Sequence, residues 1–267
     1  MNSLIPFDAL LEERVLVFLY ALTRVSGLVI VAPAPWTMAP ARVRGMLATI
    51  LALLLCVSPL GAQHRELSQQ PLAIALGIIS EACIGFCMGF TVRLVVAVAE
   101  VGSEFVAPQI GLGVAQLFDP HMHTSETSIG AFYRHLAILL SVIVGLHRQV
   151  LAALFGSFGV LPPGELVDPG RAGGAILALT AQAIEAGVRL ALPAVVVLFL
   201  VQVALAFIAR AAPALQIFSV GFAVTLGVGM LVLVLSLPDT VRLLLAEMSH
   251  VDTRIQTLLL GFAEAAP

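Results

Sequence analysis

Apolar stretches of about 20 residues recur along the whole sequence, and this recurrence limits the possible folds more than any other feature. A helix needs about 20 apolar residues to cross the hydrocarbon core of a bilayer, and it satisfies its own backbone hydrogen bonds there. The stretches are Val15–Ala34, Val43–Leu60, Leu72 to about Ala99, Ile129–Leu161, Gly173–Ala209 and Ala211–Leu237. The sequence therefore predicts an all-α integral membrane protein with about six long apolar helices.

The composition excludes an ordinary soluble domain. Of the 267 residues, 60% are hydrophobic and 11% are charged, and the mean hydropathy is +1.07, whereas soluble domains carry roughly 25% charged residues. A soluble protein of this size still exposes about a quarter of the surface of its unfolded chain, so large apolar patches would meet water. We expect lipid or partner subunits to cover this surface.

The first residues do not have the pattern of a secretory signal peptide. Asp8, Glu12 and Glu13 precede Arg14, whereas a signal peptide begins with positive charges. We therefore expect the N-terminus to remain on the mature chain.

Charge and motif content argue against nucleic-acid binding, metal binding and enzymatic chemistry. The net charge is −3 and the 13 basic residues are scattered arginines, whereas phosphate binding needs clustered basic residues. Cys56, Cys83 and Cys87 lie in apolar segments without further ligands nearby, which favours small core residues over a metal site. The GxSxG and HExxH motifs are absent. We predict a protein that is not an enzyme, needs no cofactor or metal and binds no nucleic acid.

Several ionisable residues interrupt the apolar stretches. An Arg or Glu at bilayer depth costs on the order of 3 kcal/mol even on a lenient insertion scale, so protein or water must surround these helices. Ion relays and structural contacts between helices are the two alternatives for such residues. The buried or interface charges predicted from the sequence are Arg24, Glu81, Arg93, Glu100, Glu104, Glu185, Arg189 and Arg210.

Two pairs among these charges have the i,i+4 spacing of neighbours on a helix. Glu185 and Arg189 carry opposite charges that neutralise each other, which favours a structural ion pair at a subunit interface. Glu100 and Glu104 carry like charges, so they need an outside cation or a bound proton. For this second pair a relay role and a structural role stay equally open.

The segment Gly102–Pro120 is rich in glycine and proline yet otherwise apolar, and we expect a loop there. In lipid its unpaired backbone groups would each cost several kcal/mol, so the loop must be buried in protein or line a cavity. Two interpretations stay open: an apolar plug that seals a pore by excluding water, or a buried turn between two helices. The predicted plug residues are Phe105, Gln109, Ile110, Gly111, Leu112, Gly113, Val114, Leu117 and Phe118.

Residues 239–263 predict an amphipathic C-terminal helix. Apolar residues recur with helical period at Leu244, Met248, Val251, Ile255 and Leu258, with charged residues between them. We expect this helix to lie against a membrane surface or another subunit. Residues 1–267 thus form a single membrane domain, with the N-terminal helices in 1–160, a helical hairpin in 173–237 and this tail.

A series of motifs in a fixed order makes the chain similar to a known family. RVSGLVIVAPAP (Arg24–Pro35) and PARVRGMLA (Pro40–Ala48) are followed by GFTVRLVVAVAEVGSEFVAPQIGLGVAQLFDP (Gly89–Pro120), SFGVLPPG (Ser157–Gly164), ALPAVVVLFLVQVALAFIARAAP (Ala191–Pro213) and FSVGF (Phe218–Phe222). Over nearly its whole length the chain resembles the FliR family of flagellar type III export-gate proteins. It departs from the family at Arg210–Gln216, which reads RAAPALQ where RAAPQLN is usual.

This resemblance implies a non-enzymatic subunit of a protein-export gate in the bacterial inner membrane, at the flagellar basal body. It implies a helical assembly with P-type (FliP) and Q-type (FliQ) subunits around a conduit for unfolded flagellar export substrates, and an FlhB-type switch protein nearby. The residues that match Gly102–Pro120 form a plug in that family. Many helices of such an assembly contact neighbouring subunits rather than lipid, which explains the interrupted apolar stretches.

Two alternative functions remain open for the chain. The virulence type III secretion counterpart shares the fold and mechanism implied by the resemblance, although the PARVR motif favours the flagellar branch. A small-solute or ion transporter would also use broken helices and intramembrane acids. Such a transporter predicts inverted halves, and the sequence shows no such repeat.

Overall fold

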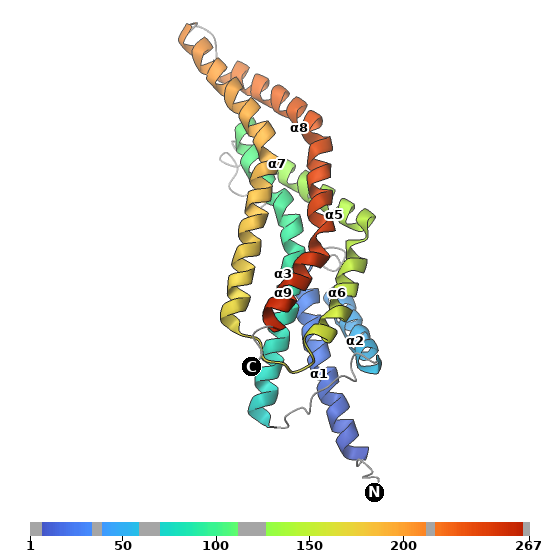
Figure 1. The fold of residues 1–267 in the computed structure, drawn as a ribbon. Coiled ribbons are helices and arrows are strands. Elements are labelled where there is room, and N and C mark those ends of the chain that lie inside the picture. Colours follow the sequence, from blue (N-terminus) through green and yellow to red (C-terminus); the bar gives the residue numbers. More distant parts are fainter. Residues whose placement is uncertain (1–6, 34–38, 59–69, 112–126, 212–216, 264–267) are drawn as a thin grey trace. The chain divides into compact units, whose positions relative to one another are not determined.

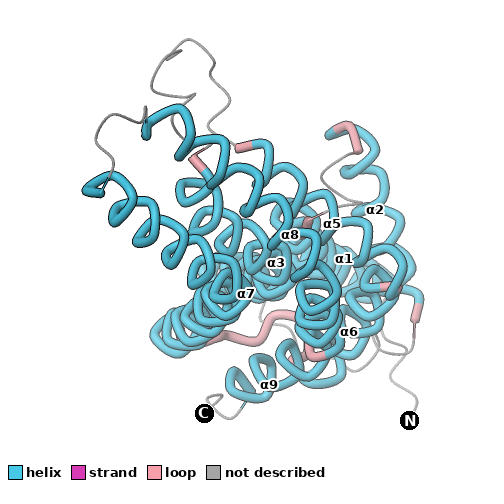
Figure 2. The backbone as a smooth tube through the Cα atoms, turned by 90° about the horizontal axis from the view of Figure 1, so that it is seen from above, coloured by secondary structure: helices cyan, strands magenta, loops and turns pink. Residues whose placement is uncertain are grey.

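The computed structural model describes residues 7–33, 39–58, 70–111, 127–211 and 217–263. Within these ranges the chain forms eight helices and no strand (Figure 1). The helices are α1 (Phe7–Val31), α2 (Ala41–Val57), α3 (Pro71–Ile110), α5 (Ser128–Val144), α6 (Leu146–Val160), α7 (Pro169–Ala211), α8 (Ile217–Ser249) and α9 (Val251–Ala263). Figure 2 shows that the described residues between helices form only short loops. The predicted all-α class is confirmed.

Four helical stretches are long and apolar enough to cross a membrane. They are Arg14–Val31, Pro71–Ile110, Gly170–Ala211 and Val220–Ala263. The helix α2 has 17 residues, and α5 and α6 form a pair bent by 65° that makes at most one further span. The membrane-protein class is confirmed, but the six long helices predicted from the sequence become four or five spans in the described part of the chain.

The bend between α5 and α6 divides the single segment predicted over Ile129–Leu161. Gly145 lies at the bend with a φ of 75°, a left-handed conformation that glycine adopts without steric strain. A right-handed helix cannot continue through such a residue, so α5 ends at Val144 and α6 begins at Leu146. With 17 and 15 residues, both helices are shorter than the about 20 residues that usually span a bilayer.

The helix α3 continues to Ile110, beyond the end predicted near Ala99. A side chain at Gly102 would have its Cβ 2.7 Å from Leu190 of α7, so the glycine allows a close contact between the two helices. Pro108 stands in the last turn, where its missing N–H removes a single helical hydrogen bond. The first part of the predicted loop is therefore helical, because contacts between helices outweigh the glycine and proline signals.

The described helices belong to two compact units. The first unit comprises residues 1–93, 145–179 and 249–267, and the second comprises residues 94–144 and 180–248. The long helices α3 and α7 each contribute one part to each unit.

In the first unit, α1 and α3 cross at a glycine-lined contact. A Cβ at Gly85 of α3 would collide with the backbone carbonyl of Arg24, and a Cβ at Gly89 would lie 2.7 Å from the carbonyl oxygen of Leu28. Small residues at such positions let helix backbones approach closely, which is a common way of packing membrane helices. The close approach brings Arg24 of α1 beside Glu81 of α3.

The C-terminal tail packs against its own chain. The helix α8 continues through Pro238 to Ser249, and α9 lies against α6 within the first unit. Val251 and Ile255 are fully buried and Leu258 is 4% exposed. The predicted apolar face is confirmed for α9. The expectation that this face covers a membrane surface or another subunit is wrong, because helices of the same chain cover it.

Candidate functional site

The first unit holds a buried ion pair between α1 and α3. The side chains of Arg24 and Glu81 are both 0% exposed. Nε of Arg24 donates to Oε2 of Glu81 at 2.5 Å, and Nη2 donates to Oε1 at 3.0 Å. This two-pronged geometry fits the planar guanidinium to the planar carboxylate. Both residues are among the charges predicted from the sequence, but the sequence does not predict that they pair.

Arg24 also holds the C-terminal end of α6. Nη1 donates to Oγ of Ser157 at 3.1 Å, and Nη2 donates to the carbonyl oxygen of Leu161 at 3.0 Å. The guanidinium carbon lies 4.1 Å from the centre of the Phe158 ring, within the range of a cation–π interaction. The last carbonyls of a helix have no partner within the helix, so Arg24 satisfies a group that would otherwise be buried without a hydrogen bond.

Glu81 and its neighbour Ser80 hold the connector between α6 and α7, residues 161–168. The N–H of Gly164 donates to Oε1 of Glu81 at 2.9 Å. Oγ of Ser80 donates to the carbonyl of Glu165 at 2.6 Å and accepts from the N–H of Val167 at 3.0 Å. An irregular segment is thus anchored by side chains that satisfy its backbone, as an apolar environment requires. Arg24, Glu81 and Ser80 with their partners form the Arg24–Glu81 clamp.

The clamp tolerates burial because each charge has several partners. Two buried charges lose solvation that their mutual attraction often fails to offset, so further hydrogen bonds are needed. Arg24 donates to a carboxylate, a hydroxyl and a carbonyl, and Glu81 accepts from a guanidinium and an amide. The pair has no net charge, so no lone charge is left among the apolar helices. The arrangement favours a structural role over an ion relay for both residues.

The remaining charges predicted as buried or interfacial lie closer to the surface of the chain. Arg93 and Glu100 of α3 are half-buried, and each has an interaction partner. Glu104 and Arg210 are exposed. Their predicted place at an interface with another subunit stays a prediction.

The predicted pairing of Glu185 with Arg189 is present in α7. Nη2 of Arg189 donates to Oε1 of Glu185 at 2.6 Å. The side chain of Glu185 is 62% exposed and that of Arg189 is 68% exposed. The pair therefore lies on the surface of this chain, within a helix that is long and apolar enough to span a membrane.

The predicted plug residues fall into two groups. Phe105, Gln109 and Ile110 belong to the end of α3, and Gly111 follows it directly; Phe105 is 48% exposed and Ile110 is fully buried. Nε2 of Gln202 in α7 donates to Oε1 of Gln109 at 2.8 Å. Gly111 has a φ of 88°, which ends the helix. Leu112, Gly113, Val114, Leu117 and Phe118 lie outside the described residues.

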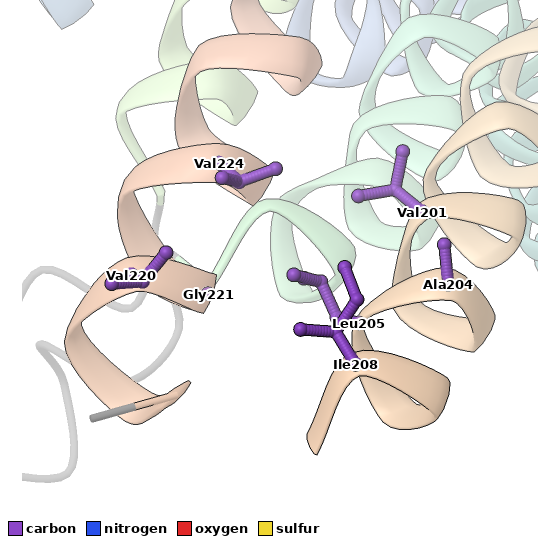
Figure 3. Close-up of a pocket in the computed structure, with 7 residues that line it drawn as sticks. All are labelled: Val201, Ala204, Leu205, Ile208, Val220, Gly221 and Val224. Atoms are coloured by element: carbon purple, nitrogen blue, oxygen red, sulfur yellow. The ribbon is translucent and has the colours of Figure 1, made fainter. Parts of the chain in front are cut away.

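The second unit also has an apolar groove between α7 and α8, with a volume of about 310 Å³. Figure 3 shows its lining residues: Val201, Ala204, Leu205 and Ile208 of α7, and Val220, Gly221 and Val224 of α8. No side chain of this lining carries a polar group, so the groove suits an apolar side chain or acyl chain and not a polar substrate.

Sequence reasoning missed the uncharged partners of the clamp. Ser80, Ser157, Phe158, Leu161 and Gly164 were not predicted as site residues. Four of them belong to the run SFGVLPPG (Ser157–Gly164), which carries part of the family resemblance. That run was the available signal, because a glycine and two prolines beside a helix end mark a fixed turn. The fifth residue, Ser80 of α3, is far from this run in sequence, and no local motif marks it.

These helices and the clamp define a class: an integral membrane protein of several apolar helices tied together by a buried charge cluster. In the part of the chain that the structure describes, no three His, Cys, Asp or Glu side chains come together as metal ligands. The sequence matches the family of bacterial export proteins, family 1, over residues 15–251. The chain belongs to this family.

Named relatives give the family a more specific setting. The chain is similar to the flagellar biosynthetic protein FliR of Caulobacter vibrioides, with 30% identity over 220 residues that cover 80% of this chain and 85% of that protein. It is 32% identical to FliR of Pectobacterium carotovorum over 68% of this chain and 71% of that protein. It is 30% identical to FliR of Escherichia coli, covering 71% of each. The resemblance to the FliR family is confirmed.

Proposed function

We propose that this chain is a subunit of the flagellar type III protein-export gate and helps to form the conduit that passes unfolded flagellar proteins across the bacterial inner membrane. The observation that carries the proposal is the match to a bacterial export family over residues 15–251, together with the similarity to FliR proteins of several bacteria. The subunit contributes a wall and a seal to a conduit, and it catalyses no reaction.

The surface of the chain supports a place among other subunits. In the most apolar 18 residues of Gly170–Ala211, only 17% are buried within the chain. The corresponding share in Val220–Ala263 is 11%. Exposed Glu185 and Arg189 lie in the first of these stretches. In lipid each would cost on the order of 3 kcal/mol, even on a lenient scale. Neighbouring protein removes this cost, and we propose P-type (FliP) and Q-type (FliQ) subunits and an FlhB-type switch protein as the neighbours.

The end of α3 supports a plug in the same conduit. Gln109 is hydrogen-bonded to Gln202, and fully buried Ile110 packs so tightly against α8 that a Cβ at Gly229 would lie 2.6 Å from it. These contacts fix the base of the segment, and Gly111 then breaks the helix. A firmly held base followed by glycine-rich apolar residues suits a seal that excludes water and still deforms when a polypeptide is pushed against it.

The test is export in the bacterium that carries this chain. Deleting its coding sequence should abolish flagella and the export of flagellar proteins into the medium, and the intact chain should restore both. A matched control is Gly156→Ala, because a Cβ at Gly156 meets no atom within 4 Å; this variant should also restore export.

Two outcomes would point elsewhere. Normal flagella in the deletion strain, with loss of some other secreted protein, would assign the chain to a virulence secretion system. Movement of a small solute or ion by the purified chain alone, without other gate subunits, would make it a transporter. Either result overturns the proposal.

A further inference from the structure

A pocket of about 340 Å³ lies between α1 and α2 in the first unit and shares no residue with the Arg24–Glu81 clamp. Ser26, Val29 and Ile30 of α1 and Ala41, Arg44 and Ala48 of α2 line it. The pocket thus combines a guanidinium and a hydroxyl with aliphatic walls. Nothing in the export role accounts for a basic side chain in this place.

Arg44 has an unsatisfied donor at this pocket. Its Nε is buried and has no hydrogen-bond partner among the described residues. A buried donor without a partner is costly, more so on a charged group, and in native proteins it commonly marks a missing ion, ligand or water. The side chain as a whole is half-buried, so the rest of the guanidinium remains within reach of a bound group.

Positive charge accumulates at this end of α2, and the described part of the chain provides no ion-pair partner for it. Arg42 and Arg44 lie at the start of the helix, and no described Asp or Glu forms an ion pair with either. The first turn contains no acidic residue, and the N-cap residue, Pro40, makes no side-chain capping bond. The positive end of the helix dipole therefore adds to two arginines, and an anion at this place would be favoured by all three.

The surroundings of the pocket suit a lipid and not a small soluble anion. Ile30, which lines the pocket, is 69% exposed, and Val29 and Ala48 make its other walls apolar. A dissolved phosphate has no use for such walls, whereas a phospholipid needs a cation for its headgroup and an apolar surface for its acyl chain. Basic pockets between membrane helices are a known way of holding anionic headgroups.

We propose that this pocket binds the phosphate of an anionic phospholipid. The phosphate accepts hydrogen bonds from Arg44 and from the hydroxyl of Ser26, near the first N–H groups of α2. An acyl chain of the lipid covers exposed Ile30 at the edge of the pocket. The proposal does not depend on the export function, because it concerns a site within one chain and its readout is lipid binding.

The test is lipid binding to the full-length chain, purified in detergent with whatever subunits accompany it and stripped of lipid. Native mass spectrometry would follow titration with phosphatidylglycerol, with phosphatidylcholine and with inorganic phosphate alone. Phosphatidylglycerol should bind at least about fivefold more tightly than phosphatidylcholine, and Arg44→Gln should lose about that factor. Arg242→Gln is the matched control. It removes an arginine that is 80% exposed and far along the chain, and it should bind as the parent does.

Two further variants keep the test decisive if Arg44→Gln folds poorly. Arg44→Lys retains the charge and should retain most of the preference for the anionic lipid. Gly45 also lines the pocket, and a Cβ there meets no atom within 4 Å, so Gly45→Leu fills part of the pocket and should weaken binding without removing a charge. Equal binding of both phospholipids overturns the proposal. So does undiminished phosphatidylglycerol binding by Arg44→Gln and Gly45→Leu. Inorganic phosphate that binds as tightly as the lipid would show a soluble-anion site instead and would also overturn it.

Discussion

Replacing Arg24 by methionine should destabilise the chain more than any substitution of an exposed charge. The change leaves the carboxylate of Glu81 fully buried with only the N–H of Gly164 as a described partner, and it removes the donors to Ser157 and Leu161. Removing one member of a buried pair costs roughly 3 to 5 kcal/mol. An effect of this size increases the unfolded fraction by about 100-fold or more.

The double variant Arg24→Met with Glu81→Gln distinguishes the cost of a lone buried charge from the cost of the lost Arg24 contacts. It removes both charges and still offers an amide oxygen to the N–H of Gly164, so no lone buried charge remains. Because the larger part of the penalty comes from that lone charge, the double variant should be clearly more stable than Arg24→Met. Arg242→Met provides the control, because its ion pair with Asp239 spans 3.4 Å and is 80% and 76% exposed. Surface pairs of this kind contribute at most about 1 kcal/mol.

The assay is pulse proteolysis in detergent across a series of urea concentrations, read on the gel band of this chain. This readout reports the chain itself even within a larger complex. The reasoning is refuted if Arg24→Met lies within about 1 kcal/mol of the parent. It is equally refuted if the double variant is no more stable than Arg24→Met, because the charge would then not be the cause.

Three further predictions concern other parts of the chain. Gly85→Ala should lower the level of folded chain on a protein blot, because its Cβ would collide with the backbone of Arg24, whereas Gly156→Ala should leave it unchanged. Arg189→Ala should weaken assembly with other subunits, measured by co-purification; if assembly is normal while motility is lost, an ion-coupling role replaces the structural one. Deleting residues 112–116, beyond the contacts of Gln109 and Ile110, should leave assembly intact but make membranes conduct ions. A membrane that stays tight would reduce this segment to a buried turn.

The helices could be predicted from the sequence because lipid imposes a strong local rule. Runs of about 20 apolar residues identify the cores of α1, α3, α7 and α8, and the period of the tail predicts the buried face of α9. Their ends were predicted less well. The glycine and proline signals that suggested an end near Ala99 are overridden by contacts between α3 and α7, which no local pattern reveals.

The site was predictable only in part, for a related reason. Arg24 and Glu81 stand out individually because charges are rare in apolar stretches. Arg24 and Glu81 are 57 residues apart in sequence, and their pairing depends on the crossing of α1 and α3, which Gly85 makes close. Ser157 and Gly164 carry no charge, and their role appears only when α6 is placed beside α1.

The central claim is that this chain belongs to a multi-subunit export gate, and the most direct test is the mass of the complex that it forms. The tagged chain, expressed in detergent-extractable form together with the P-type and Q-type subunits of the same bacterium, should purify as a single species. Native mass spectrometry should give a mass that contains this chain and several copies of both partners. Without the partners, the chain should aggregate or be degraded, because its exposed charges and apolar faces lack cover. A folded, monodisperse monomer obtained alone, which does not bind either partner when mixed with it, would contradict the account.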